Sequence, residues 1–216
     1  MEPFTTHTGL VATLNRANVD TDQIIPKQFL KSIKRTGFGP SAFFDWRYDE
    51  KANPDPSFEL NHPRFDGRSI LVTRNNFGCG SSREHAVWAL HQDGYNVIVA
   101  PRIGEGDAEV PGFADIFRNN SFKNGLLTIE LTNCQVDEIM DLVEANEGLT
   151  ATADLPNQEL VLHVEGAEKR YGFEIDPGIK NQLVQGLDDI DQSLKSVDAI
   201  DTFETKHDNQ LAEVIL

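Results

Sequence analysis

The sequence predicts an α/β fold, arranged as a single domain over residues 1–216. Between residues 69 and 146, short apolar runs alternate with segments of helix-forming composition. This alternation is typical of parallel strands joined by crossover helices around a central sheet. The expected strands are residues 69–74, 96–101 and 126–131, and the expected helices are residues 82–92, 113–120 and 135–146. A chain of 216 residues is long enough to bury one core of ordinary size.

The flanking regions complete this prediction. A strand is expected at residues 8–14, followed by a polar segment at 15–26 that is rich in turn-forming residues, and Pro26 is expected to begin a short helix. A helical turn is expected at 43–46. Alternating apolar residues on both sides of Gly166 predict an antiparallel hairpin. From Pro177 onward the chain is expected to be mainly helical, with the acidic part after Leu187 forming a solvated surface.

The net charge of −16 is unevenly distributed along the chain. Residues 1–100 hold 11 basic and 11 acidic side chains, whereas the remainder holds 8 basic and 24 acidic ones. This balance argues against nucleic acid or an anionic membrane as a partner. A local basic island is an exception, and it is either a solvated helix face or a surface that steers an anionic substrate; it consists of Lys27, Lys31, Lys34 and Arg35.

The two cysteines, Cys79 and Cys134, do not form a C-x-x-C pair. A disulfide framework or a complete metal or iron–sulfur site is therefore not expected from this chain alone. The first residues lack the pattern of a signal peptide, and no apolar stretch approaches the length of a membrane span. We therefore expect a cytoplasmic protein with reduced thiols.

Residues 76–86, with the sequence NFGCGSSREHA, follow an expected strand and open an expected helix. Backbone N–H groups at such a position favour anions, and the guanidinium of Arg83 suits a carboxylate. This predicts anion recognition beside a hydroxyl group. Ser81 and Glu84 also fit the S-x-x-E capping box, which requires no function. Capping does not explain Gly78 and Gly80, which would allow another surface to approach the backbone closely.

Three ordered motifs carry a resemblance to a known family. They are NVDTDQIIP at 18–26, NFGCGSSREHA at 76–86 and GFADIFRNNSFKNGLL at 112–127, and the intervening HTGLV, PKQFLK, RTGFG and FFDWR extend the match. Together they resemble the swivel domain of the aconitase family, most closely the small subunits of its isopropylmalate-type hydro-lyases. The resemblance implies interconversion of 2-isopropylmalate and 3-isopropylmalate through isopropylmaleate, by loss and return of water, in leucine biosynthesis.

The resemblance also implies site residues and a partner. In this family a [4Fe–4S] cluster acts as Lewis acid on a small dicarboxylate, and its cysteine ligands lie on a separate large subunit. Ser81 matches the general base, which acts as an alkoxide, and its oxyanion must be stabilised by neighbouring donors. Arg83 matches a substrate-carboxylate ligand and Ser82 an adjacent hydrogen-bonding position. Thr21 and Asp22 match a second motif, in which Asp22 would pair with a cation of the partner or form an Asx turn.

Substrate choice within the family is expected to depend on residues 30–38, which face the group on the gamma carbon. Leu30, Ile33 and Phe38 are candidates for apolar contact with an isopropyl group, whereas Arg35 is a candidate for a larger acid. The sequence RTGFG at 35–39 resembles the isopropylmalate type of the family, and this resemblance favours isopropylmalate as the substrate. Hydratases of citraconate, 2-methylmalate or homoaconitate and a non-catalytic swivel-type binding module are the alternatives. A serine hydrolase is disfavoured because the G-x-S-x-G elbow is missing.

Cys79 and His85 lie close to the serines in the sequence. We interpret His85 as a packed structural residue and Cys79 as a small structural one. RIGEGDAEVPG at 102–112 departs from the family pattern, because it separates a strand from the next helix and places Gly112 where relatives have serine. A mobile loop is the expected structure. A metal site in this segment would lack the ligand spacing of an EF-hand.

Overall fold

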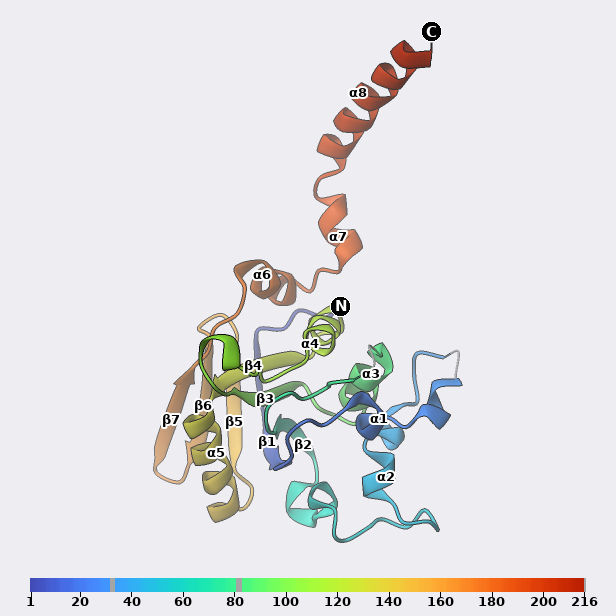
Figure 1. Cartoon of the computed structure of the whole chain (residues 1–216). Coiled ribbons are helices and arrows are strands. Elements are labelled where there is room, and N and C mark those ends of the chain that lie inside the picture. The colour runs from blue at the N-terminus through green and yellow to red at the C-terminus, as the bar shows by residue number, and fades with distance from the viewer. Residues whose placement is uncertain (32–33, 81–82, 216) are drawn as a thin grey trace.

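The computed structural model describes residues 1–31, 34–80 and 83–215 (Figure 1). Its centre is a mixed sheet with the strand order β4-β3-β2-β1-β5-β6-β7. Four strands run parallel: β1 (Thr6–Thr13), β2 (Arg68–Val72), β3 (Val97–Arg102) and β4 (Leu127–Thr132). Three more form an antiparallel meander beside β1: β5 (Thr150–Asp154), β6 (Glu159–Val164) and β7 (Ala167–Gly172). The predicted α/β class is confirmed.

The parallel half is built from the apolar runs that predicted it. In β2 and β3 the side chains of residues 70–72 and 97–100 are completely buried, as expected for parallel strands covered on both faces. Helix α3 (Glu84–Gln92) connects β2 to β3, and α4 (Asp115–Lys123) connects β3 to β4. Helix α5 (Asn133–Ala145) begins at a capping box between Thr132 and Gln135 and packs against β1 to β4.

The antiparallel half contains one strand that the sequence did not predict. The hairpin of β6 and β7 around Gly166 is confirmed. Strand β5, with the sequence TATAD, pairs with both β1 and β6. Ala151 and Ala153 are completely buried. Such small side chains give a weak apolar pattern, although they fit well on a sheet face that is already covered.

Short helical elements occupy the first part of the chain. They are α1 (Thr21–Ile24), η1 (Lys27–Lys31), η2 (Gly39–Ser41), α2 (Phe44–Arg47), η3 (Glu59–Asn61) and η4 (Pro63–Phe65). The helix expected after Pro26 is therefore a 3₁₀ turn, and the expected turn at 43–46 is α2. Arg47 donates two hydrogen bonds to Asp93, at 2.8 and 2.6 Å, and both side chains are mostly buried. This pair fixes α2 against the end of α3.

The start of helix α3 differs from the prediction. The helix begins at Glu84, with Arg83 as an N-cap residue that makes no side-chain capping bond. Glu84 is therefore at the first helical position rather than the third, and the predicted capping box is wrong. The side chains account for the difference: Arg83 is directed toward Asp22, and Glu84 accepts a hydrogen bond from Asn124 Nδ2 at 3.0 Å.

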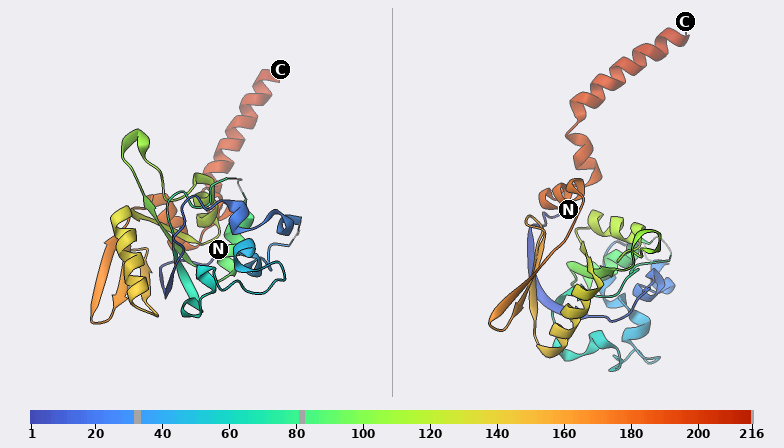
Figure 2. Two further views of the ribbon diagram at one scale, coloured as in Figure 1. Left: turned by 60° about the horizontal axis from the view of Figure 1, so that its bottom comes forward. Right: turned by 60° about the vertical axis from the view of Figure 1, so that its left-hand side comes forward.

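The inserted segment at 102–112 forms a closed excursion between β3 and α4. Ile103 and Val110 exchange two backbone hydrogen bonds, of 3.0 and 2.8 Å, and a 3₁₀ turn, η5 (Gly106–Ala108), lies between them. Arg102 pairs with Glu109 at 2.9 Å. In Figure 2 the segment projects from the sheet in green. Within the described part of the chain, no group of three side chains suited to holding a metal ion is found, here or elsewhere.

The C-terminal part is helical, as predicted, but its surface is not uniformly polar. Helix α6 (Pro177–Gln185) lies against the body, whereas α7 (Asp189–Leu194) and α8 (Val197–Ile215) lead away from it (Figures 1 and 2). Ile190, Leu194 and Phe203 are each more than 60% exposed. The prediction of a simply solvated surface missed these apolar side chains. None of the described helices combines the length and apolar character that a membrane span requires.

Candidate active site

Three segments far apart in the sequence meet beyond the carboxyl ends of β1, β2 and β3. Gly78 N donates to Val19 O at 2.7 Å, and Thr21 N donates to Cys79 O at 2.9 Å. On the other side, the backbone at Phe77 bonds to Gly112 and Ala114, at 2.9 and 3.0 Å. The three motif segments are therefore neighbours. In open α/β sheets, ligands bind at this end of parallel strands.

These segments enclose a cleft of about 260 Å³. Its lining combines the first two motifs with the start of α4, and consists of Thr21, Gly78, Gly80, Arg83, Ala114, Asp115, Ile116 and Phe117. Ser81 and Ser82 lie outside the described residues, but both ends of the segment that carries them, Gly80 and Arg83, line the cleft. The start of α4 carries lining residues that the sequence did not predict for the site, although they belong to the third motif.

Gly78 allows the close approach that its sequence position predicted. Its φ is +75°, in the left-handed region that favours glycine, and a Cβ atom added there would lie 2.2 Å from Cγ of Phe117. Phe117 is almost fully buried and stacks edge-on against Phe77, with ring centroids 5.3 Å apart. The wall of the cleft therefore depends on a missing side chain at this position.

Gly78→Ala is expected to destabilise the fold by more than about 1 kcal/mol, because backbone strain adds to the clash with Phe117. Gly67→Ala is a matched control, since Gly67 has a similar φ of +78° and no atom near the added Cβ. Chemical denaturation of both variants measures the difference. Equal losses of unfolding free energy would show that only backbone strain matters and that Phe117 adjusts without cost.

Arg83 is held by an acidic partner within the same chain. Its Nη1 atom donates a short hydrogen bond to Asp22, and Lys27 Nζ lies 3.2 Å from the same carboxylate. Desolvation of Asp22 opposes ionisation, but the hydrogen bonds from Lys27 and Arg83 prevail and lower its pKa. The carboxylate therefore keeps its charge at neutral pH. The chain itself supplies two cations to Asp22, and the pairing with a cation of the partner stays a prediction.

Helix α1 explains the positions of Thr21 and Asp22. Asp20, not Asp22, caps this helix: its carboxylate accepts from Gln23 N at 2.8 Å, and Gln23 Oε1 accepts from Asp20 N at 2.9 Å. The backbone N–H of Ile24 donates to Asp20 O at 3.0 Å, and the Asp22 carboxylate accepts from Arg83, so Asp22 does not form the Asx turn given as the alternative. Thr21 is buried at the floor of the cleft, and Asp22 is free to reach Arg83.

The described residues of the expected specificity segment do not line the cleft. Leu30 is half-buried against the core, and Arg35 is exposed, with its guanidinium 5.6 Å from the ring centre of Trp88. Phe38 is only 3% exposed, because it packs against His85 and Trp88, so it cannot offer a free apolar surface. Ile33 lies outside the described residues. The described apolar side chains that line the cleft are instead Ala114, Ile116 and Phe117, of which Ile116 is 53% exposed.

His85 packs against two aromatic side chains, and Cys79 is half-buried. The ring of His85 lies 5.3 Å from Phe38 and 4.7 Å from Trp88, measured between centroids. Burial raises the pKa of the Cys79 thiol, and the nearby charge of Asp20 raises it further. Cys79 is therefore a neutral thiol at physiological pH, which agrees with a structural role.

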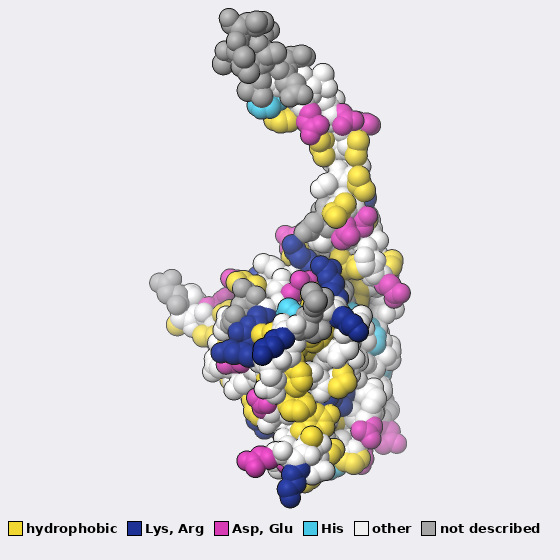
Figure 3. Space-filling model, turned by 90° about the vertical axis from the view of Figure 1, so that its right-hand side faces the viewer, with side chains coloured by type: hydrophobic (Ala, Val, Ile, Leu, Met, Phe, Trp, Pro, Cys, Tyr) yellow, Lys and Arg dark blue, Asp and Glu magenta, His cyan; other side chains and the backbone are white. Residues whose placement is uncertain are grey.

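The basic island lies on the same side of the molecule as α1. Lys27 contacts Asp22 at the cleft, and Lys31 and Arg35 are exposed. Figure 3 shows lysine and arginine side chains gathered at the centre of this face. The arrangement places positive charge beside the cleft, in a chain that is otherwise strongly acidic. Such a field favours the approach of an anionic substrate.

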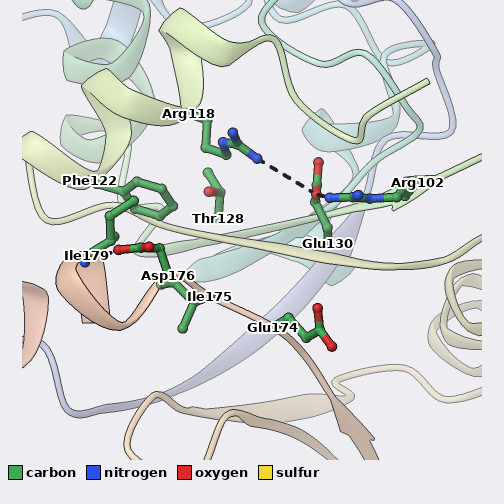
Figure 4. Close-up of a pocket in the computed structure, with 9 residues that line it drawn as sticks. All are labelled: Arg102, Arg118, Phe122, Thr128, Glu130, Glu174, Ile175, Asp176 and Ile179. Carbon is green, nitrogen blue, oxygen red and sulfur yellow. Dashed lines mark hydrogen bonds and ion pairs between the residues drawn. The ribbon is translucent and has the colours of Figure 1, made fainter. Parts of the chain in front are cut away.

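A larger hollow of about 380 Å³ lies between α4, β4 and the connection from β7 to α6 (Figure 4). Its charged side chains are largely engaged with one another. Glu130 accepts from Gly112 N at 2.8 Å and pairs with Arg102, and Arg118 lies 4.0 Å from it. This network fixes Gly112 and hence the start of α4. It contains none of the side chains predicted for the site.

The sheet, the three converging segments and the cleft define this chain as an aconitase swivel-type domain. Residues 1–134 match the family model of the aconitase C-terminal domain. The 3-isopropylmalate dehydratase small subunit of Desulforapulum autotrophicum is 61% identical over 206 residues, covering 95% of this chain and 96% of that protein. The chain belongs to the aconitase family, among its 3-isopropylmalate dehydratase small subunits.

A solved structure supports the fold independently. The crystal structure of 3-isopropylmalate dehydratase (leuD) from Methanocaldococcus jannaschii is similar to this chain with a TM-score of 0.59. The alignment covers 92% of this chain and 99% of the other, at 22% sequence identity. At this identity the likeness concerns the fold alone.

Proposed function

We propose that this chain is the small subunit of a 3-isopropylmalate dehydratase, which interconverts 2-isopropylmalate and 3-isopropylmalate through isopropylmaleate. The observation that carries the proposal is the convergence of the three motif segments on one cleft, with Arg83 in its wall. The relative at 61% identity supports the substrate. The cleft belongs to a hydro-lyase that acts on a small dicarboxylate.

Arg83 is proposed to bind a carboxylate of the substrate. Its side chain is 20% exposed and lines the cleft, and Asp22 orients the guanidinium through one Nη atom. A guanidinium has five N–H donors in a fixed plane, so donors remain for a bidentate contact. Lys27 shares the Asp22 carboxylate, which leaves net positive charge around it. These features favour a dianionic substrate.

Ser81 is proposed to remove the proton alpha to the substrate carboxylate. It follows Gly80 directly and precedes Arg83 by two residues, and both of these described residues line the cleft. An alkoxide requires preorganised donors or positive charge, because serine is a very weak acid. The guanidinium of Arg83 and the basic island provide positive charge in this region. Ser82 is proposed to donate a hydrogen bond to the bound acid.

The leaving hydroxyl group needs an acid that we assign to the partner. A [4Fe–4S] cluster on a large subunit would supply Lewis acidity toward the hydroxyl and a carboxylate. Cys79 and Cys134 lie on separate elements, the loop after β2 and helix α5, so they do not form a shared ligand set. The role proposed for this chain is to bind the substrate and move the proton.

Anaerobic reconstitution with a cluster-bearing large subunit tests the proposal. Formation of isopropylmaleate from 3-isopropylmalate, followed by ultraviolet absorbance, is expected from the complex and not from either subunit alone. Turnover by this chain alone would contradict the assignment of the Lewis acid to the partner. Citraconate, 2-methylmalate and homoaconitate serve as a comparison panel, because pockets that differ by a methyl group discriminate by only about 1–3 kcal/mol.

The same panel separates the rival functions. Preferred turnover of another acid would assign the chain to a related hydratase. A well-assembled complex that is inactive on every acid would indicate a non-catalytic binding module. The net charge of −16 opposes a nucleic-acid-binding role for such a module.

A further inference from the structure

The two C-terminal helices expose most of the large apolar side chains found on the described surface. Six such side chains are exposed, and five of them belong to α7 and α8: Ile190, Leu194, Val197, Ile200 and Phe203. Their exposures range from 39% to 70%. Exposed apolar side chains scattered singly are ordinary, but a cluster on one element indicates an interaction surface.

The apolar side chains of α8 share one face of the helix. Val197, Ile200 and Phe203 are spaced by three residues, which places them on adjoining turns. A single amphipathic helix in water gains little from its own propensity, and most helical stability comes from packing of the apolar face. We name this face the tail stripe, defined by Val197, Ile200 and Phe203.

The base of the tail is firmly attached to the body. In α6, Leu183 is completely buried, and its carbonyl accepts a hydrogen bond from Phe4 N at 2.8 Å. The carbonyl of Gly186 accepts from the N-terminal ammonium of Met1 at 3.1 Å. Beyond this anchor the helices lead away from the sheet (Figures 1 and 2). Helix α8, which carries the tail stripe, therefore extends away from the body, whereas α6 is anchored to it.

Charge indicates what covers the tail stripe. Residues 187–216 contain eight acidic and two basic side chains, a net charge of −6. Asp201 and Glu204 flank Phe203 in the sequence. Pairing of two such helices would bring like charges together, which opposes a self-associated coil. An apolar groove edged by lysine and arginine would instead complement both the stripe and its acidic margins.

We propose that α7 and α8 form a docking arm that binds such a groove on the large cluster-bearing subunit. This inference rests on the proposed function, which requires a large subunit. The arm binds as an amphipathic helix in a groove, with Ile200 and Phe203 as anchors. The arm would thus hold the two subunits together through a surface that takes no part in catalysis at the cleft.

Binding of the full-length chain to the large subunit tests the arm. The double variant Ile200→Asp with Phe203→Asp is expected to raise Kd at least tenfold, and wild-type binding is expected to weaken with salt. The matched control is Thr202→Asp with Thr205→Asp, which adds the same charge to other faces of α8 and should leave Kd within about twofold. Circular dichroism should show that the sheet body melts at the same temperature in all three proteins.

Each alternative has a distinct outcome. Equal Kd values for the two double variants would overturn the proposal. Dimerisation of the isolated chain in sedimentation, abolished by Ile200→Asp with Phe203→Asp, would assign the stripe to a second copy and would also overturn it. A wild-type complex that assembles through the stripe but turns over no isopropylmalate would reject the proposed substrate and leave the docking arm intact.

Discussion

Ser81→Ala is expected to lower turnover of the assembled enzyme by about a hundredfold to ten-thousandfold, the range for loss of a positioned acid or base. The physical reason is that the substitution removes the hydroxyl proposed to take the proton, whereas Ser82 is proposed only to donate a hydrogen bond to the bound acid. Substrate binding should change little, because Arg83 and Thr21 remain. The measurement is kcat and KM for 3-isopropylmalate in the reconstituted complex.

The controls for Ser81→Ala separate chemistry from folding. Since Arg83 is the N-cap residue of α3 and makes no side-chain capping bond, loss of the Ser81 hydroxyl should leave the unfolding free energy nearly unchanged. Ser57→Ala makes the same chemical change at an exposed loop position away from the cleft, and full activity is expected. Unchanged turnover in Ser81→Ala would exclude this serine as the base.

Arg83→Ala is expected to lower kcat/KM roughly thirtyfold to several thousandfold. This corresponds to a rise of about 2–5 kcal/mol in the activation free energy. The substitution removes the carboxylate ligand and also leaves Asp22 with only Lys27. Arg83→Lys keeps the charge but not the planar fork, so it should recover only part of the loss. If the bound substrate and the transition state lose this contact equally, most of the effect should be a higher KM.

Asp22→Asn tests whether Arg83 acts directly or only through its ion pair. If Arg83 binds the substrate, removal of the Asp22 charge should cost much less than removal of Arg83. A double-mutant cycle then gives the coupling between the two side chains. Equal losses from Asp22→Asn and Arg83→Ala, with no further loss in the double variant, would show that the pair is structural and that another group binds the carboxylate.

The fold was predictable wherever a segment had a strong apolar pattern. The runs SILV and NVIVA are buried strands, and the spacing around Gly166 gave the hairpin. Strand β5 was not predicted, because Ala151 and Ala153 are small and pair with a covered surface that the local sequence does not reveal. The tail stripe was missed because dense acidic residues conceal the helical spacing of its apolar ones.

The candidate site was partly predictable for a similar reason. The glycines of 76–86 indicated close approach, and Gly78 does adjoin Phe117. The pairing of Arg83 with Asp22 joins two distant motifs and depends on their tertiary arrangement. Phe38 was placed at the substrate because an apolar residue in a loop can serve a ligand or the core. Contacts with His85 and Trp88, which no local pattern encodes, assign it to the core.

The excursion between β3 and α4 has a practical consequence. Two backbone hydrogen bonds between Ile103 and Val110 close the base of this loop, and Glu130 fixes Gly112 just beyond it. Residues 104–109 therefore form a loop whose two ends are held together. We expect that residues inserted into this loop leave the Ile103–Val110 hydrogen bonds in place. The bridge between Phe77 and Phe113 beyond them should therefore not shift. Doubling a flexible loop costs only about 0.6 kcal/mol in closure entropy. The excursion is thus a natural place to insert an affinity tag or a fluorescent label in the working enzyme.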